Sequence, residues 1–90
     1  MSYWIVNFRG HGTFDLHVNF PEGAVNRDSI VFANICEIAH IPGVPGDTPW
    51  MGDAAMEIRN IVPQNTHSVV FKVEIAWGSD LDFRMFIEIN

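Results

Sequence analysis

Asp15, His17 and Asn19 are the side chains whose types and spacing come nearest to a catalytic or metal-binding set. They alternate along one predicted strand, so all three project from the same face. Asn7 is expected beside Asp15 on the neighbouring strand. A histidine near a carboxylate can act as a general base close to neutral pH, and the pair can supply two metal ligands. A metal centre needs three or four ligands, so the sequence predicts no bound metal and no cofactor.

The single cysteine, Cys36, is the other candidate nucleophile. It would touch His40 only in a helix, because residues four apart share a helix face. In a strand the two lie about 13 Å apart, so a cysteine–histidine pair is not expected. With one cysteine the chain has no internal disulfide, and its first residues lack the basic start and long apolar core of a signal peptide. These features predict a reducing, cytoplasmic location.

The segment 42–53 is rich in proline and glycine and is expected to be irregular. Long loops of compact domains often carry function. Trp50 has Asp47, Thr48 and Asp53 as polar neighbours, a combination that could stack on a sugar ring or anchor a protein partner. We therefore expect these four residues to form the ligand-binding site. The alternative is that Trp50 and Met51 fold back and plug the open end of the domain.

Apolar residues at every second position indicate the strands that must position these groups. The pattern runs through 67–77 and again through 81–89, which is typical of strands with one buried face. A link of three residues lets these segments pair as a hairpin that ends in a left-handed Asp80. The predicted partners are Trp77 with Leu81, Ile75 with Phe83, Val73 with Met85, and Phe71 with Ile87.

Segment 54–62 is predicted to be a third strand, joined to 67–77 by a four-residue loop. Its alanine, methionine, glutamate and arginine residues leave a helix as the alternative. Cross-strand pairing favours the strand, because it matches apolar with apolar residues and opposite charges with each other. The expected partners are Val62 with His67, Ile58 with Phe71, Met56 with Val73, and Glu57 with Lys72.

The first part of the chain predicts a second hairpin of the same design, from 3–9 and 13–20. Its turn places Gly12 in the left-handed conformation and sets Phe8 opposite Phe14. Segment 30–41 follows and is apolar on both faces, so we expect a strand that is covered on both sides, at a crossing or an oligomer contact. A bulge within it and a buried helix are the alternatives.

Two sheets with one apolar face each must bury those faces against one another. The sequence therefore predicts an all-β fold, a small antiparallel β-sandwich or flattened barrel in a single domain, 1–90. Its expected strands are 3–9, 13–20, 30–41, 54–62, 67–77 and 81–89.

Composition limits the partners. Five lysines and arginines against eleven aspartates and glutamates give a net charge of −6, which argues against nucleic acid and anionic membranes. No apolar run approaches the ~20 residues of a membrane span. Apolar residues on the expected outer faces, including Tyr3, Ile5 and Phe86, predict self-association.

These observations favour a non-enzymatic binding module that forms a homo-oligomer and contacts a protein or a glycan through the 42–53 loop. The alternative is a small enzyme or metal-binding protein that uses the polar row Asn7, Asp15, His17 and Asn19.

Overall fold

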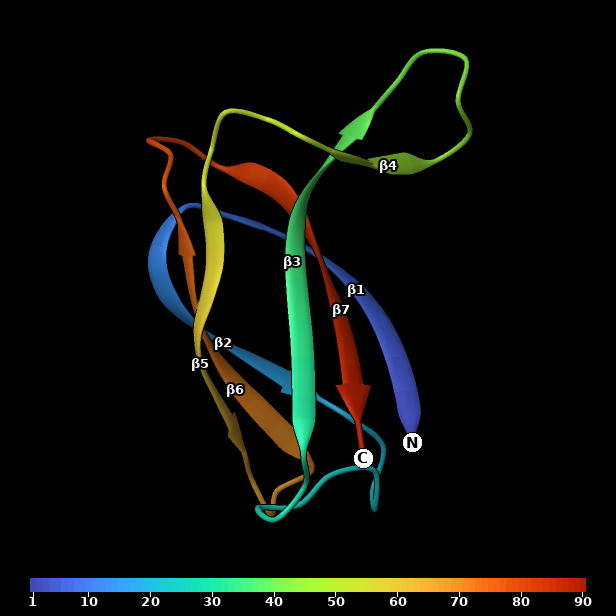
Figure 1. Cartoon of the computed structure of the whole chain (residues 1–90), viewed down its shortest axis with the longest axis vertical. Coiled ribbons are helices and arrows are strands. Elements are labelled where there is room, and N and C mark those ends of the chain that lie inside the picture. The colour runs from blue at the N-terminus through green and yellow to red at the C-terminus, as the bar shows by residue number, and fades with distance from the viewer.

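Seven strands and no helix make up the structure, a computed structural model that describes all residues from 1 to 90 (Figure 1). The strands are β1 Ser2–Gly10, β2 Gly12–Asn19, β3 Val31–His40, β4 Asp47–Trp50, β5 Met56–Pro63, β6 Ser68–Ile75 and β7 Leu81–Ile89. The predicted all-β fold is confirmed, and each expected strand is found with its ends within two residues of the predicted ones.

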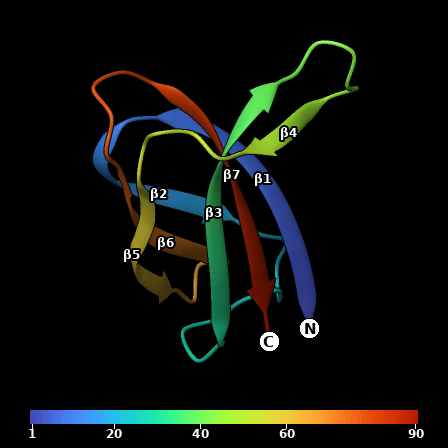
Figure 2. The same cartoon turned by 45° about the horizontal axis from the view of Figure 1, so that its top comes forward.

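The strands form two antiparallel sheets that pack as two layers. Sheet A has the order β1-β7-β3-β4, and sheet B has the order β2-β6-β5. In Figure 2 the strands of sheet B run across those of sheet A, and the β3–β4 hairpin projects beyond both layers. Four of the six connections carry the chain from one sheet to the other, so most sequence neighbours lie in different layers.

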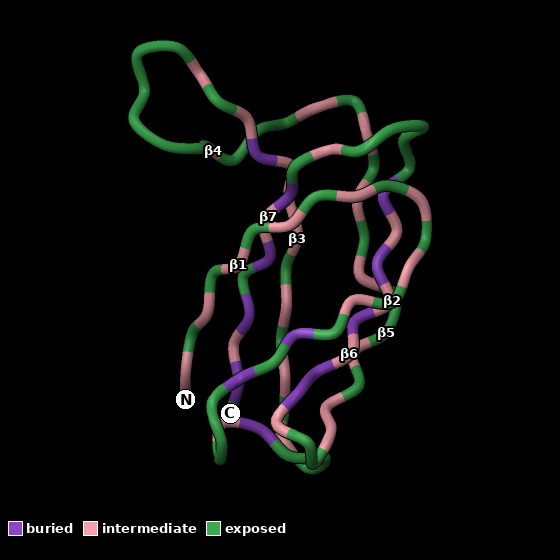
Figure 3. The backbone as a smooth tube through the Cα atoms, turned by 180° about the vertical axis from the view of Figure 1, so that it is seen from behind, coloured by how far each residue is buried: buried purple, intermediate pink, exposed green.

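The core lies between the central strands of the two sheets, β6 and β7. Val69, Phe71, Val73 and Ile75 of β6 have no exposed surface, and the inward-facing residues of β7 are at most 3% exposed. The buried members of β7 are Phe83, Met85, Ile87 and Ile89. These are the alternating rows that the sequence predicts, and Figure 3 shows them as buried backbone inside the layers. Burying one such side chain contributes about 1.5–3 kcal/mol.

Both predicted three-residue hairpins are wrong. β6 pairs with β2 and β5, and β7 pairs with β1 and β3, so Ile75 and Phe83 are not cross-strand partners. Phe8 pairs with Phe83 and Phe14 with Val73, so Phe8 and Phe14 do not pair either. The short links fold the chain from one sheet onto the other. The apolar residues of β6 and β7 then meet face to face across the core. They are buried against each other in this arrangement, as they would be side by side in a hairpin.

Of the two residues predicted to be left-handed, Gly12 is and Asp80 is not. Gly12 has the expected left-handed φ of 74°, where the chain bends from β1 into β2. Asp80 does not have the predicted left-handed conformation. The one residue other than glycine with a positive φ is His67. His67 closes the β5–β6 turn, in which the Gln64 amide donates a hydrogen bond of 2.9 Å to the carbonyl of Ser68.

The third predicted strand is confirmed, but its register is wrong. β5 does pair with β6, yet Ile58 lies opposite Val73 and Ile61 opposite Phe71. A bulge between Ile58 and Asn60 adds one residue to β5 and shifts the pairing along it. The predicted partners Ile58–Phe71, Met56–Val73, Glu57–Lys72 and Val62–His67 are replaced mainly because the turn is longer than expected: Pro63 lies opposite Val69, so residues 64–68 form it, and the bulge changes the register by one residue only.

Segments 30–41 and 42–53 also differ in part from expectation. The first is one strand, β3, with an unbroken register, and its outer Phe32 is 58% exposed rather than covered. The second contains a short edge strand, β4, where an irregular segment was expected. Pro49 is tolerated there because an edge strand has one side without ladder hydrogen bonds.

Candidate functional site

A cleft of about 320 Å³ lies at the base of the β3–β4 hairpin, between Trp50 and Trp77. Its polar groups are the carboxylates of Glu37 and Asp53. The complete lining is Glu37, Trp50, Met51, Gly52, Asp53, Ala54, Trp77 and Leu81. We call this the tryptophan cleft.

Two backbone contacts bring its sides together. Antiparallel pairing of β3 with β4 sets Trp50 directly opposite Glu37. On the other side, the Ala76 amide donates a hydrogen bond of 2.9 Å to the Ala55 carbonyl, which ties the β6–β7 connection to the β4–β5 connection. The backbone amide of the next residue, Trp77, donates a hydrogen bond of 2.8 Å to the Ile75 carbonyl. This tight turn ends β6 and leaves the Trp77 side chain 45% exposed.

Gly52 lies against the Glu37 carboxylate in the cleft. A Cβ atom at this position would coincide with the Glu37 carboxylate, whose Cδ would lie 2.9 Å from it. The absence of a side chain at Gly52 therefore lets the carboxylate of Glu37 rest against the 50–54 backbone. A second hollow of about 300 Å³ lies beside the same segment and includes Cys36 in its lining.

The cleft combines aromatic faces with hydrogen-bond acceptors. Trp50 is 50% exposed, and neither Trp50 nor Trp77 belongs to an aromatic pair. Glu37 and Asp53 take part in none of the five ion pairs of the structure. About half of the surface of each tryptophan is thus exposed, and both carboxylates lack an ion-pair partner. An ionised carboxylate accepts hydrogen bonds only, so the ligand must bring the donors.

The four residues expected to form the loop site do not lie together. Trp50 and Asp53 line the cleft, whereas Asp47 lines a separate hollow with Arg9 and Asp82. Thr48 lies on β4 opposite Ala39, outside the cleft. The plug alternative requires a buried Trp50, which the half-exposed indole does not provide.

The predicted polar row is divided as well. Asp15, His17 and Asn19 lie on β2 in sheet B, but Asn7 lies on β1 in sheet A, where it accepts a 2.8 Å hydrogen bond from Arg84. Asp15 forms a 2.9 Å ion pair with Lys72. Asn7 is not beside Asp15 as expected, because β1 and β2 do not pair. No three histidine, cysteine, aspartate or glutamate side chains converge as metal ligands would.

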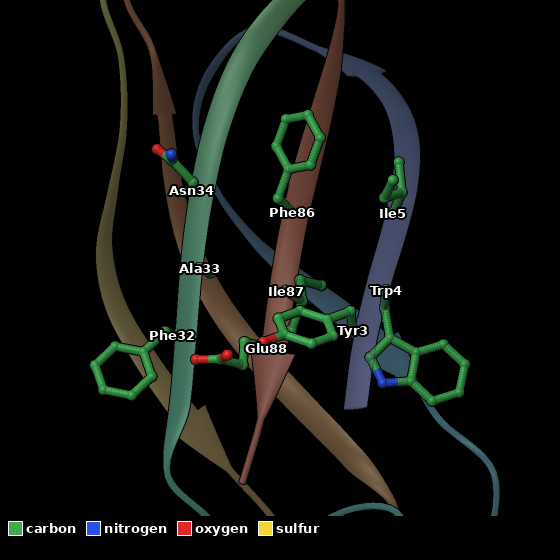
Figure 4. A pocket seen from close by; sticks show the side chains of 9 residues that line it. All are labelled: Tyr3, Trp4, Ile5, Phe32, Ala33, Asn34, Phe86, Ile87 and Glu88. Carbon is green, nitrogen blue, oxygen red and sulfur yellow. The ribbon is translucent and has the colours of Figure 1, made fainter. Parts of the chain in front are cut away.

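A second surface stands out on the outer side of sheet A. Its exposed members are Tyr3 and Ile5 of β1, Phe32 of β3 and Phe86 of β7, and they border a shallow hollow of about 490 Å³ (Figure 4). We call this the apolar face. Glu88 is its one charged residue, and it lies opposite Tyr3. Glu88 raises the pKa of the Tyr3 phenol, through hydrogen bonding first and charge repulsion second.

Sequence reasoning did not identify Trp77 and Glu37 as site residues. Trp77 falls in phase with the buried row of 67–77, and Glu37 lies within the apolar segment 30–41. The available signals were the Gly78 that follows Trp77 and the charge of Glu37 in an otherwise apolar run. Both mark places where a regular buried strand is interrupted.

The structure contains no helix of the length and apolarity needed to cross a membrane. Comparison of the chain with protein-family models, with curated proteins and with solved structures finds no match, so the geometry described above is the basis for inferring its function.

Proposed function

We propose that this chain is a non-enzymatic binding module, that the tryptophan cleft is its ligand site, and that the ligand is a carbohydrate. One observation supports the proposal above all. Two half-exposed indoles, one at the end of β4 and one in the β6–β7 connection, lie beside two carboxylates that have no ion-pair partner.

The chemistry of the lining favours a sugar. A pyranose ring presents C–H groups on its faces, which can pack on an indole, and hydroxyl donors on its rim, which a carboxylate can accept. Specific sites of this kind combine apolar area with a few polar groups that fix orientation. The cleft is at the small end of ligand sites, so a terminal sugar unit fits it better than a long chain does.

The cleft lining contains no histidine, serine or cysteine, and its titratable groups are the carboxylates of Glu37 and Asp53. Because a pair of carboxylates is also what glycoside hydrolases use, a bound glycan that is recovered uncleaved after incubation with the protein supports binding without turnover, and a cleaved one contradicts it. The predicted polar row Asp15, His17 and Asn19 lies on sheet B, away from the cleft residues.

The test is binding of the purified protein to an array of immobilised glycans, followed by titration with each soluble glycan that binds. Trp50→Ala and Trp77→Ala should each weaken binding at least about tenfold, a loss that corresponds to one buried stacking contact. Phe32→Ala is the matched control, because Phe32 is an aromatic residue with 58% exposure outside the cleft. If no glycan binds, or if both tryptophan variants bind normally, the proposal fails.

A pair of isosteric variants separates a sugar from a cationic ligand. Glu37→Gln and Asp53→Asn keep an acceptor oxygen and remove the charge. A sugar should tolerate these changes with a modest loss of affinity. An ammonium group, for example a lysine of a protein partner, should lose most of its binding, because the carboxylates and the cation–π contacts would act together.

A further inference from the structure

β1 is the sheet edge that lacks the usual protection against pairing with another strand. In natural proteins, edge strands are kept from pairing with strands of other chains by short length, proline, bulges or charged side chains. β4 has four residues and contains Pro49, β5 has the bulge at Arg59, and β2 carries Asp15 and His17. β1 has nine residues in unbroken register with β7, no proline, and Arg9 as its one charged residue. Figures 1 and 2 both show it as the outermost strand of its layer.

The free hydrogen-bonding groups of this edge can be assigned to particular residues. Ile30 and Asn90 exchange both backbone hydrogen bonds, at 3.3 and 2.9 Å, so they form a hydrogen-bonded pair that continues the β3–β7 ladder. Such pairs alternate along a strand, so the even-numbered residues of β7 face β3 and the odd-numbered ones face β1. The even-numbered residues of β1 therefore bond to β7. Its odd-numbered residues direct their N–H and C=O groups outward: Tyr3, Ile5, Asn7 and Arg9.

Apolar surface reaches this edge on both sides of the sheet. On the outside, Ile5 is 64% exposed and continues the apolar face (Figure 4). On the inside, Trp4, Val6 and Phe8 pack against the core but are only partly buried. A strand added to β1 would cover both rows at once, which adds apolar burial to the backbone hydrogen bonds.

We propose that a second copy of this chain supplies that strand, with β1 pairing antiparallel to β1 about a two-fold axis beside Val6. An antiparallel strand is its own complement under a two-fold axis, so one sequence provides both sides of the interface. The sheets of the two copies then join into one continuous sheet, with order β4-β3-β7-β1-β1-β7-β3-β4.

The choice of Val6 as the centre follows from the free groups and the charges. This register pairs Tyr3 with Arg9 of the second copy and Ile5 with Asn7 of the second copy, so all four outward-facing residues find partners. Other registers leave some of them unpaired. It also places the guanidinium of Arg9, which pairs with Asp82 of its own chain at 3.0 Å, beside the Tyr3 ring of the second copy. There it is within reach of Glu88, which has no ion-pair partner in its own chain. Although the chain carries a net charge of −6, β1 contains no acidic residue to repel its copy.

Sedimentation velocity over a wide range of protein concentration tests the assembly. The expected species has twice the mass of the chain. Ile5→Lys places a charge on the joining edge and should weaken the dimer at least about tenfold. Val62→Lys is the control, because Val62 is 48% exposed on the edge strand of sheet B, and it should leave the dimer intact. A monomer at all concentrations overturns the proposal, and so does a dimer that Val62→Lys disrupts and Ile5→Lys does not.

Cysteine cross-linking tests the register directly. In a Cys36→Ser background, Val6→Cys should form a disulfide-linked dimer under mild oxidation, because residues opposite each other at a non-hydrogen-bonded position have Cα atoms about 4.5 Å apart. Ile5→Cys should not cross-link, because the two copies of residue 5 are offset by two positions. Efficient cross-linking of Ile5→Cys without Val6→Cys overturns this register. Trp50→Ala should dimerise normally, which separates this interface from the proposed ligand site.

Discussion

The Ala76 amide donates a hydrogen bond of 2.9 Å to the Ala55 carbonyl, and this contact joins two connections that are far apart in sequence. One connection leads from β4 to β5 and the other from β6 to β7. Trp50 ends β4 just before the first connection and Trp77 lies in the second, so this hydrogen bond holds the two indoles at the tryptophan cleft.

Gly52→Ala should impair ligand binding at the cleft with little loss of stability. The new Cβ atom would clash with the Glu37 carboxylate, and the flexible end of that side chain would have to move away. We expect an altered NMR chemical shift at Glu37 and weaker binding of any glycan that the array identifies. Gly78→Ala is the control, because its Cβ atom would meet nothing within 4 Å. An unchanged Glu37 signal in Gly52→Ala would contradict the proposed crowding.

Gly12→Ala should destabilise the protein by about 1 kcal/mol, because Gly12 has a φ of 74°, which residues with a Cβ atom rarely adopt. No atom lies within 4 Å of the new Cβ position, so backbone strain is the one cost. Gly78→Ala again provides the comparison, since it adds the same group in equally open space without a positive φ. Urea unfolding of the two variants measures the difference, and equal midpoints would show that the bend at Gly12 carries no strain.

Phe83→Ala should cost about 3–5 kcal/mol of unfolding free energy, as expected for a large cavity in a core. Phe83 is fully buried and lies between Phe8 and Phe14, with ring centroids 5.8 and 6.2 Å away. Phe32→Ala removes the same group from a side chain that is 58% exposed. In the monomer it should change stability by no more than about 0.5 kcal/mol. Comparable losses for the two variants in chemical denaturation would contradict the assignment of inner and outer faces.

The Tyr3 phenol should ionise at higher pH than the ordinary value of 10.0, because the neighbouring Glu88 raises its pKa. Tyr3 is the one tyrosine in the chain, so tyrosinate absorbance reports on it alone. A folded pKa above the unfolded one stabilises the fold below pH 10.0, and this contribution is lost as the pH rises through the folded pKa. Glu88→Gln should move the titration midpoint downward. A midpoint that stays in place would show that Glu88 does not act on Tyr3.

The sequence predicts which residues are buried better than which strands are neighbours. Alternation along 67–77 and 81–89 identifies one buried face on each segment, and Phe71 and Phe83 are buried as expected. Apolar residues at every second position show which face of a strand is buried, but not which strand pairs with it. A three-residue link can close a hairpin or fold the chain onto a second sheet, and both arrangements bring Ile75 and Phe83 to the same core.

The sequence predicts only those residues of the candidate site that stand out within their own segment. Trp50 and Asp53 are identified from the composition of their own loop, and both line the cleft. Glu37 and Trp77 enter the site through β3–β4 pairing and through the Ala55–Ala76 hydrogen bond. Contacts of that kind depend on the arrangement of the two sheets, which the pattern of apolar residues leaves open.

The position of β7 has a consequence for synthesis of the protein. β7 lies in the middle of sheet A and contacts both β1 and β3, yet it is the last strand of the chain. Sheet A cannot assemble on the ribosome before residues 81–89 have been made, and until then the apolar sides of β1 and β3 have no strand between them. Folding of sheet A should therefore be slow for a domain of this size, since it depends on contacts between distant segments.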